Sequence, residues 1–363
     1  MGNSRLYGLG VLRIISMFGI IGLHILNAGG AFARDSLTSV YGLSVSVLYI
    51  LCAASVNTFA MLTGYLYVDK PNVKYKNVLK LVFTVLFYSV IITALLMAFK
   101  PGAFGSILNI ITSLIPPLAG KYWYITCYVL LFVLIPFINK LINSLTHGQF
   151  KLLIVLLVIL TSVLPTFLLT DFFKLEQGYS SAWLIVCYFI GAYIKRSKQR
   201  LSTRTVLVLY LLCVITVIGV SVASWLVLKK FSVYNTLVEY TSPFIVLISV
   251  FSIYLFSKIQ IKNKFLTKAI DSLSGSAFDA YILHGHPMIF VCFINDNFAI
   301  IRNLEFFKAI SVILLSILAI YLMCWAVSQL KSLILKITRI DFLLDKFGYK
   351  IDCLLEKISN THV

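Results

Sequence analysis

Leu6 to Asn27 reads LYGLGVLRIISMFGIIGLHILN, and this segment decides how the rest of the chain is interpreted. It is long and apolar enough to cross a bilayer as one helix, yet it contains Arg13 and His24. At about 100° per residue, eleven residues make three turns plus about 20°, so both side chains share a face, roughly 16 Å apart along the axis. Because an arginine inside hydrocarbon is costly, the pair indicates a functional site facing a polar cavity. The alternatives are that Arg13 snorkels to the headgroups and that His24 only packs between helices.

The composition is typical of a polytopic membrane protein. Of the 363 residues, 60% are hydrophobic and only 12% are charged, whereas a soluble domain has about 25% charged residues. The net charge of +18 is spread in short basic clusters between apolar segments, and no basic patch with interleaved aromatics occurs. We therefore predict an all-α bundle that contacts membrane lipids and does not bind nucleic acid. The seven cysteines form no CxxC pair, so the sequence indicates neither a disulfide framework nor a metal site.

About ten apolar segments are long enough, or nearly so, to span the bilayer. They lie near residues 6–28, 41–67, 78–99, 122–143, 150–170, 181–196, 205–228, 240–257, 275–295 and 309–335. The stretch from Phe104 to Ala119 contains Pro116-Pro117 and is predicted to form a partly buried or re-entrant loop. We assign residues 1–338 to a transmembrane domain. In the tail, 339–363, apolar residues at helical spacing alternate with charges, which predicts an amphipathic helix on the inner leaflet.

The distribution of basic residues gives the orientation. If the N-terminus is cytoplasmic, 22 of the 31 lysines and arginines fall in inside segments and eight in outside segments, with Arg13 in the membrane. We therefore predict a multi-pass protein of the plasma membrane with both termini in the cytoplasm, Arg13 on the cytoplasmic side and His24 towards the outside. An alternative for the first segment is a cleaved signal peptide, with the apolar run Ile14–Leu26 followed by the small residues Ala31 and Ala33.

Two further motifs place polar or aromatic residues at the ends of spans. Thr63, Gly64 and Tyr65 lie near the cytoplasmic end of the second span, where small residues permit close approach of another helix or of a ligand. The sequence KYWY at 121–124 opens the fourth span at its outer end and contains Trp123. These aromatics form either an interfacial belt, which their position favours, or a platform on which a sugar ring stacks.

The ninth span is unusually polar, since SGSAFDAYILHGHP at 274–287 contains Asp279, His284 and His286. Seven residues make two turns less about 20°, so Asp279 and His286 are predicted to share a face of the helix. His284 is predicted to point elsewhere, and Pro287 to kink the helix. The cluster indicates a proton relay of a transporter or a catalytic or acceptor site. A purely structural role is the least favoured of the three, because isolated polar groups in lipid are costly.

Four of these stretches, in this order, resemble the acyltransferase-3 family of integral-membrane O-acyltransferases. LRIISMFGIIGLH resembles the first helix of that family, with its arginine, ten residues and a histidine. LTGYLY resembles its motif of a small residue, glycine and an aromatic, although Thr63 stands where the family usually has serine. YWYITCYVLLFVLIPFINKLI and SAFDAYILHGHP resemble two later segments, the second carrying Phe-x-x-Tyr-x-x-His with Tyr281 and His284. The resemblance covers residues 6–335, and we expect no appended extracytoplasmic hydrolase-like domain.

The resemblance implies transfer of an acyl group, usually acetyl, from cytoplasmic acyl-CoA (acetyl-CoA) to a hydroxyl of an extracytoplasmic or membrane-linked glycan, such as exopolysaccharide or capsule. Arg13 then holds a phosphate or polarises the thioester carbonyl, and His24 acts as general base or as transient acyl carrier. The predicted substrate-binding residues are Thr63, Gly64, Tyr65, Trp123, Asp279, Tyr281, His284 and His286. No bound cofactor is predicted.

The alternative function is a proton-coupled secondary transporter of a small anion or metabolite. In that interpretation Arg13, Asp279, His284 and His286 form the proton and anion pathway. Transporters often contain paired inverted repeats with broken helices in both halves, and the two halves of this sequence do not match.

Overall fold

The computed structural model describes residues 6–32, 37–70, 74–100, 102, 105–197, 201–229 and 231–360, with side chains as far as 356. Within these residues every regular element of secondary structure is a helix. The longer helices are α1 (Tyr7–Leu26), α2 (Val40–Tyr67), α3 (Lys76–Phe99), α5 (Trp123–Ser144), α6 (His147–Val158), α8 (Ser181–Arg196), α9 (Thr203–Leu228), α11 (Pro243–Ser257), α15 (Phe306–Ile337) and α16 (Ile340–Asn360). Shorter helices are α4 (Ile107–Leu114), α7 (Leu164–Leu168), α10 (Ser232–Leu237), α12 (Lys264–Gly275), α13 (Ala277–His284) and α14 (Pro287–Ile289). Single turns of π-helix (η3, Ile159–Val163; η5, Phe290–Ile294) and of 3₁₀-helix (η4, Glu176–Gly178; η6, Ala299–Asn303) join them.

The fold class is a polytopic helical membrane protein, as predicted. Fewer helices than the predicted ten are long enough to span a membrane. In the described part, seven helices are long and apolar enough to cross a membrane, with α6 to α7 counted as one. The halves Lys264–His284 and Pro287–Asn303 add an eighth if they form one span, and they meet at a bend of 66°. At 16 and 15 residues, α8 and α11 are shorter than a bilayer requires. The sequence had predicted about ten spans, because it counted these three segments as full crossings.

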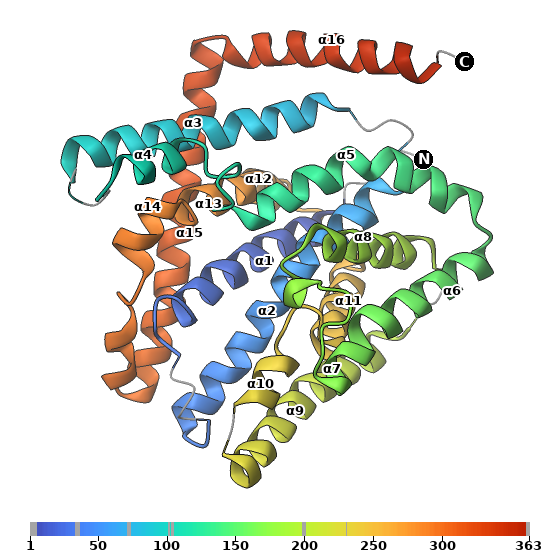
Figure 1. The fold of residues 1–363 in the computed structure, drawn as a ribbon, viewed down its shortest axis with the longest axis vertical. Helices are drawn as coiled ribbons and strands as arrows, with labels where there is room; N and C mark the ends of the chain where they lie inside the picture. The colour runs from blue at the N-terminus through green and yellow to red at the C-terminus, as the bar shows by residue number, and fades with distance from the viewer. Residues whose placement is uncertain are drawn as a thin grey trace.

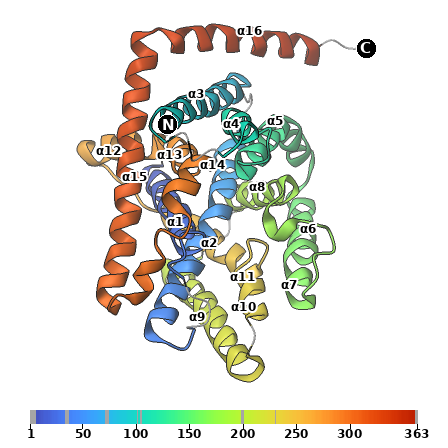
Figure 2. The same ribbon diagram turned by 60° about the vertical axis from the view of Figure 1, so that its left-hand side comes forward.

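The centre of the bundle is formed by α1 and α2, which the other helices surround (Figures 1 and 2). In the most apolar window of α2, 72% of the residues are buried, and in that of α1 61%, against 28% in α3 and α9 and 22% in α15. The outer helices therefore expose the apolar faces that lipid would cover. Because α1 packs against α2, α11, α12, α13 and α15, it is an integral part of the core. That position disfavours the interpretation of its segment as a cleaved signal peptide.

Two glycines bring the backbones of α2 and α8 into direct contact. A Cβ added to Gly191 on α8 would lie 1.9 Å from the carbonyl oxygen of Met61, and one added to Gly64 on α2 would lie 2.1 Å from that of Tyr188. Small residues commonly permit such close crossings between membrane helices. Gly64 thus serves the packing of a helix, which is one of the two uses that its motif allowed.

The C-terminal helix α16 turns away from α15 and runs across α3 (Figure 1). Asp345 of α16 accepts hydrogen bonds from Lys80 (2.9 Å) and Lys76 (3.2 Å), and these bonds lower the pKa of its carboxyl group. Phe342 and Phe347 are exposed. The predicted tail is therefore a helix with a polar side towards α3, and its contact with the inner leaflet stays a prediction.

The proline-containing stretch before α5 forms the short helix α4, which packs along α3. Ile107 and Leu108 on α4 are exposed, and the turn at Pro116 and Pro117 leads directly into α5. Residues 101, 103 and 104, where the predicted loop begins, lie outside the described residues. The rest of this stretch is thus a surface helix and a turn at the edge of the bundle.

The contact between α2 and α8 predicts a sharp difference between two glycine substitutions. In Gly191→Ala the new Cβ would meet the Met61 carbonyl, so the helices must separate, and we expect the protein to lose about 1–3 kcal/mol of stability. Gly219→Ala in α9 is the matched control, since a Cβ there meets nothing within 4 Å, and it should be neutral or stabilising by up to about 1 kcal/mol. Thermal unfolding of both variants in detergent measures the difference, and equal melting temperatures would contradict it.

Candidate active site

Arg13 and His24 lie on one unbroken helix, α1, so the shared face predicted from their spacing is preserved. Both side chains are partly exposed, although most of α1 is buried. Between them, Gly19 faces α2 so closely that an added Cβ would lie 2.0 Å from the hydroxyl oxygen of Ser55. The close contact fixes α1 against α2, and with it the positions of both polar side chains.

A second histidine, His284, lies next to His24. Their ring centroids are 5.0 Å apart, and Phe290 packs edge-on against His24 at the same distance. Because Nδ1 of His284 lies against the carbonyl oxygen of Ala280, that nitrogen carries the proton, which leaves Nε2 of the neutral ring as an acceptor. Among the described residues, neither Nε2 of His284 nor Nδ1 of His24 has a hydrogen-bond partner. The two imidazoles thus present free nitrogens inside an otherwise apolar bundle.

Aromatic rings connect this histidine pair with the end of α5. Tyr281 lies beside His284, with centroids 6.1 Å apart, and beside Tyr124 at 5.8 Å. Trp123 packs against Tyr124 at 5.3 Å and is stacked on Tyr240 at 6.1 Å. Only 7% of Tyr124 is exposed, so it faces the protein interior. The expectation of an interfacial belt is therefore wrong for this motif, because its rings pack against α13 and the loop before α11.

Asp279 is fully engaged by neighbouring helices. Its carboxylate pairs with Lys331 of α15 at 2.8 Å, and it accepts hydrogen bonds from Ser328 and from the hydroxyl of Tyr88 on α3 (3.1 Å). The carboxylate and the ammonium are both nearly buried. A buried charge is tolerated when it is paired and hydrogen-bonded, so this ion pair joins α3, α13 and α15.

His286 does not share a face with Asp279, which corrects the prediction from helix geometry. The helix ends at His284, and the chain bends before Pro287 starts α14. Nδ1 of His286 accepts a hydrogen bond from the N–H of Met288, so Nε2 carries the proton and donates to a backbone carbonyl of α4 at 3.2 Å. His286 is thus a helix cap at the break. With Asp279 and His286 both bonded, the structure gives no support to a proton relay through them.

The residues of the second-span motif lie apart from the histidine pair. The hydroxyl of Thr63 is hydrogen-bonded to the Phe59 carbonyl (3.1 Å) and shares a hydrogen bond with the hydroxyl of Tyr128 (3.2 Å). The ring of Tyr65 lies under the ammonium of Lys195, 5.0 Å from its centroid. With Gly64 in the contact with α8, the substrate-binding role of all three stays a prediction.

A basic cavity of about 480 Å³ opens where α2, α5 and α8 end. Its lining includes Asp69, Lys70, Asn139, Lys140, Asn143 and Arg196. Asp69 pairs with Arg196 at 3.2 Å, and among the described residues neither Lys70 nor Lys140 forms an ion pair. Burial and then the guanidinium of Arg13 lower the pKa of Lys70. Because Lys70, Lys140 and Arg196 outnumber the single carboxylate of the lining, the cavity suits an anion.

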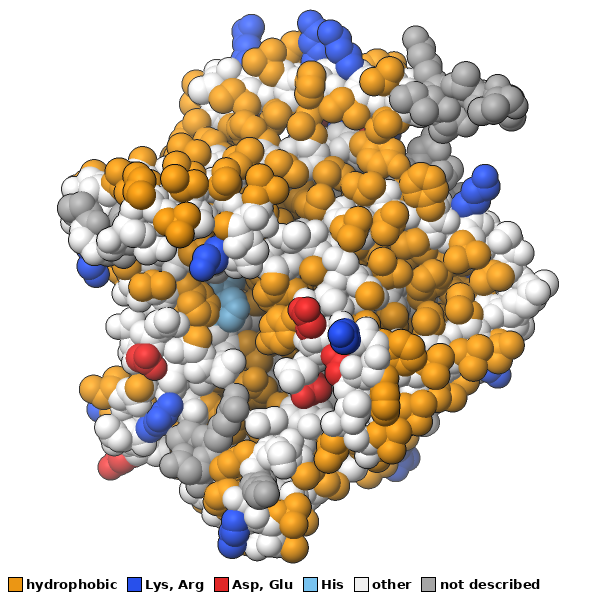
Figure 3. Space-filling model, in the orientation of Figure 1, with side chains coloured by type: hydrophobic (Ala, Val, Ile, Leu, Met, Phe, Trp, Pro, Cys, Tyr) orange, Lys and Arg blue, Asp and Glu red, His pale blue; other side chains and the backbone are white. Residues whose placement is uncertain are grey.

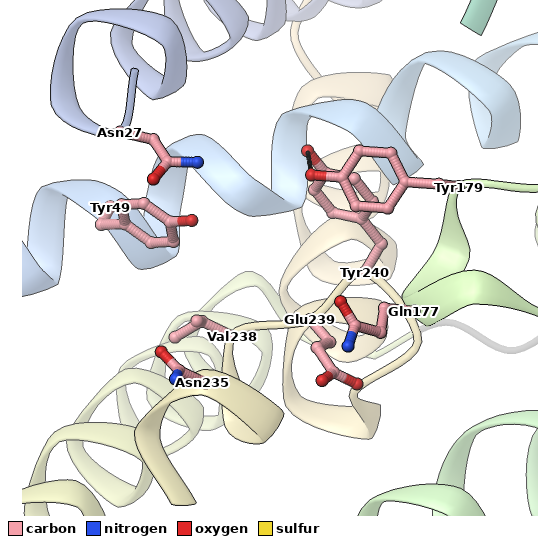
Figure 4. Close-up of a pocket in the computed structure, with 8 residues that line it drawn as sticks. All are labelled: Asn27, Tyr49, Gln177, Tyr179, Asn235, Val238, Glu239 and Tyr240. Carbon is pink, nitrogen blue, oxygen red and sulfur yellow. Dashed lines mark hydrogen bonds between the residues drawn. The ribbon is translucent and has the colours of Figure 1, made fainter. Parts of the chain in front are cut away.

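A second cavity, of about 260 Å³, lies towards the other end of α2 (Figure 4). We call it the outer cavity; its lining is Asn27, Tyr49, Gln177, Tyr179, Asn235, Val238, Glu239 and Tyr240. Tyr49 in this cavity and Val68 in the basic cavity are nineteen residues apart along α2, which is roughly 28 Å. The two cavities are thus separated by about the thickness of a bilayer's hydrocarbon core.

Several residues of the site were not identified from the sequence. Lys331 was counted only as a basic residue next to the membrane, and Glu239 lies between two predicted spans. Tyr179 and Tyr240 come from different loops and meet only in the folded chain, at 4.9 Å. The one available signal was that acidic residues are rare, 13 in the whole chain, so a carboxylate beside a span is unusual.

One protein family matches the sequence over most of its length. The model of this family, described as an acyltransferase domain, matches residues 6–328, a range that contains Arg13, His24, Tyr281 and His284. No curated protein and no solved structure matches the chain. The matched range starts at α1 and ends within α15, and so takes in both cavities and the histidine pair. The chain therefore belongs to the acyltransferase-3 family of membrane acyltransferases.

Proposed function

We propose that this chain is a membrane O-acyltransferase that moves an acetyl group from cytoplasmic acetyl-CoA to a hydroxyl of an extracytoplasmic or membrane-linked glycan, such as exopolysaccharide or capsule. The observation that carries the proposal is the free nitrogen of His24 beside His284. Leaving a buried polar atom without a partner costs about 1–3 kcal/mol, and such exceptions are typical of sites that a substrate completes.

The basic cavity supports an anionic donor. Its Lys70 and Lys140, which form no ion pair among the described residues, suit the phosphates of a coenzyme A, and Arg13 on α1 offers a further cation within the bundle. The long and narrow pantetheine arm would then extend along α1, with the thioester beyond Arg13. The planar guanidinium can donate hydrogen bonds to a phosphate or to the thioester carbonyl, on which negative charge develops in the transition state.

His24 supports the transfer itself. The hydroxyl oxygen of the acceptor bonds to the carbonyl carbon, the carbon–sulfur bond breaks, and the coenzyme leaves as a thiol. Acting as general base, His24 accepts the hydroxyl proton and passes it to the departing thiolate. Acting as acyl carrier, it first receives the acetyl group on its free nitrogen and then releases it to the hydroxyl. In both routes Nε2 of His284 is an acceptor that can orient an N–H of His24.

Replacing His24 with alanine should abolish transfer, because it removes the ring that accepts the proton or the acyl group and leaves only His284, whose proposed role is to orient that ring. We expect O-acetylation of the glycan to fall at least about 100-fold in a glycan-producing host, measured as O-acetyl groups on the purified polymer. The matched control is His147→Ala, which removes an exposed histidine at the start of α6 and should leave acetylation unchanged. Equal acetylation with wild type and with His24→Ala would refute the catalytic role.

Arg13→Lys tests the donor side, since lysine keeps the charge but lacks the planar fork. We expect activity to fall at least about 10-fold, mainly through a higher KM for acetyl-CoA, while the melting temperature stays the same. Arg204→Lys, at the exposed start of α9, is the control for the same chemical change. Unchanged kinetics in Arg13→Lys would mean that Arg13 only reaches towards the lipid headgroups.

A further inference from the structure

The outer cavity begins one turn beyond His24. Asn27, which ends α1 and lines the cavity, is three residues after His24, a rise of roughly 4.5 Å along the helix. The lining residues come from α1, α2, α10 and two loops, all of which the basic-residue distribution assigns to the outer half of the protein. A molecule in this cavity would thus be next to the candidate catalytic histidine, on the side away from the basic cavity.

The polar groups of the cavity are uncharged amides and one carboxylate. Figure 4 shows Asn27, Asn235, Gln177 and Glu239 arranged around it on different elements. Among the described residues, no hydrogen bond engages these four side chains, and neither lysine nor arginine lines the cavity. Amides offer both donors and acceptors, and a carboxylate offers acceptors, which together match the hydroxyls of a sugar.

An aromatic wall closes one side of the cavity. Tyr179 and Tyr240 lie together, with a hydrogen bond between their hydroxyls (Figure 4). Trp123 stacks on Tyr240 with the rings 16° from parallel. The backbone of Tyr240 is held by the buried amide of Asn57, which donates to its carbonyl at 2.7 Å and accepts from Trp183 at 2.9 Å. The wall is therefore preorganised, and aromatic faces suit the C–H faces of carbohydrate rings.

The loop that carries Gln177 and Tyr179 has an unusual backbone. Lys174, Glu176 and Gln177 adopt positive φ angles of 49°, 52° and 58°, which costs energy for residues with a side chain. Both carboxylate oxygens of Asp171 accept from backbone N–H groups of this loop, at 2.8 and 2.9 Å, and hold it in place. A strained loop that is fixed in this way keeps its side chains aimed into the cavity.

Glu239 is the one acidic side chain in the lining of the cavity, and the lining contains no lysine or arginine, although the chain as a whole carries +18. Burial and the nearby carboxylate of Asp171 raise the pKa of Glu239 to about 7. Figure 3 shows a few acidic side chains near the middle of one face of the molecule, beside a basic side chain. Lys174, which is exposed, does not line the cavity. Because the lining contains no cation, a carboxylate or phosphate on a ligand would be buried there without a charged partner.

We infer that the outer cavity is the acceptor subsite and that it binds an uncharged sugar residue, with its ring on Tyr240 and its hydroxyls on the amides and on Glu239. The role of this sugar as acceptor rests on the proposed function, but the binding of the sugar does not depend on transfer. It names a class of acceptor: neutral hexose or N-acetylhexosamine residues are accepted, and uronic acids or phosphorylated sugars are rejected.

The test is a titration of the purified full chain in detergent with disaccharides, followed by saturation-transfer NMR. The probes are cellobiose and N,N′-diacetylchitobiose, which are uncharged, and digalacturonate, which is anionic. We expect saturable binding of at least one uncharged probe and at least about tenfold weaker binding of digalacturonate. Tyr240→Leu and Asn235→Leu should each weaken the binding of the uncharged probe about tenfold. Glu239→Gln should reduce the difference in affinity between the uncharged probe and digalacturonate.

Two controls separate this inference from the proposed function. Glu305→Gln makes the same change at an exposed position outside the cavity and should not alter binding. His24→Ala should abolish transfer and keep sugar binding. Binding with no transfer in wild type would overturn the proposed function and leave the subsite standing. No saturable binding of either uncharged sugar, equal affinity for digalacturonate, or binding that is insensitive to both Tyr240→Leu and Asn235→Leu would overturn the inference.

Discussion

Every polar group buried in an apolar bundle needs a partner, and the arrangement of this protein follows from that constraint. A charge or amide left unpaired away from water costs several kcal/mol. Membrane helices therefore place such groups where neighbouring helices can form hydrogen bonds or ion pairs with them. Asp279 meets Lys331, Ser328 and Tyr88, and Asn57 meets Trp183 and the carbonyl of Tyr240. These contacts tie helices together that the sequence separates by up to 183 residues. His24 and His284 are the contrast, since each has a ring nitrogen with no partner in the described part.

The break after α13 determines where Asp279 and His284 lie relative to the neighbouring helices. Pro287 has no N–H to continue the helix, and the side chain of His286 caps the next turn in its place. The two halves therefore meet at 66° and do not continue as one rod. Because α13 ends at His284, it carries Asp279 towards α15 and still places the last ring against α1. One short helix thus serves the ion pair on one side and the imidazole pair on the other.

Features that depend on the periodicity of one helix were predicted correctly from the sequence. Features that depend on contacts between distant residues were not. The common face of Arg13 and His24 follows from eleven residues of one helix, and it is preserved in α1. The same arithmetic failed for Asp279 and His286, because it assumed that the helix continues through Gly285 and Pro287. The partner of Asp279 is 52 residues away, and the wall of the outer cavity joins loops around residues 179 and 240. Neither contact leaves a periodic pattern in the sequence from which it could be predicted. Trp123 was similarly ambiguous, since a belt and an interior cluster require the same residue types at the same span end.

The opposite character of the two cavities favours group transfer over transport of a whole molecule. One end of α2 collects lysines together with the Arg196–Asp69 ion pair, and the other collects amides and a carboxyl group without lysine or arginine. An anion bound in the first would have to leave its lysine partners to cross the apolar middle, which is costly, and would then reach a cavity whose lining has no cation. An acetyl group carries no charge, so it alone can pass from one environment to the other at little electrostatic cost. On this argument the charged part of the donor would stay in the basic cavity and the acceptor would bind in the outer cavity. The neutral acetyl group would be transferred between them at the histidine pair.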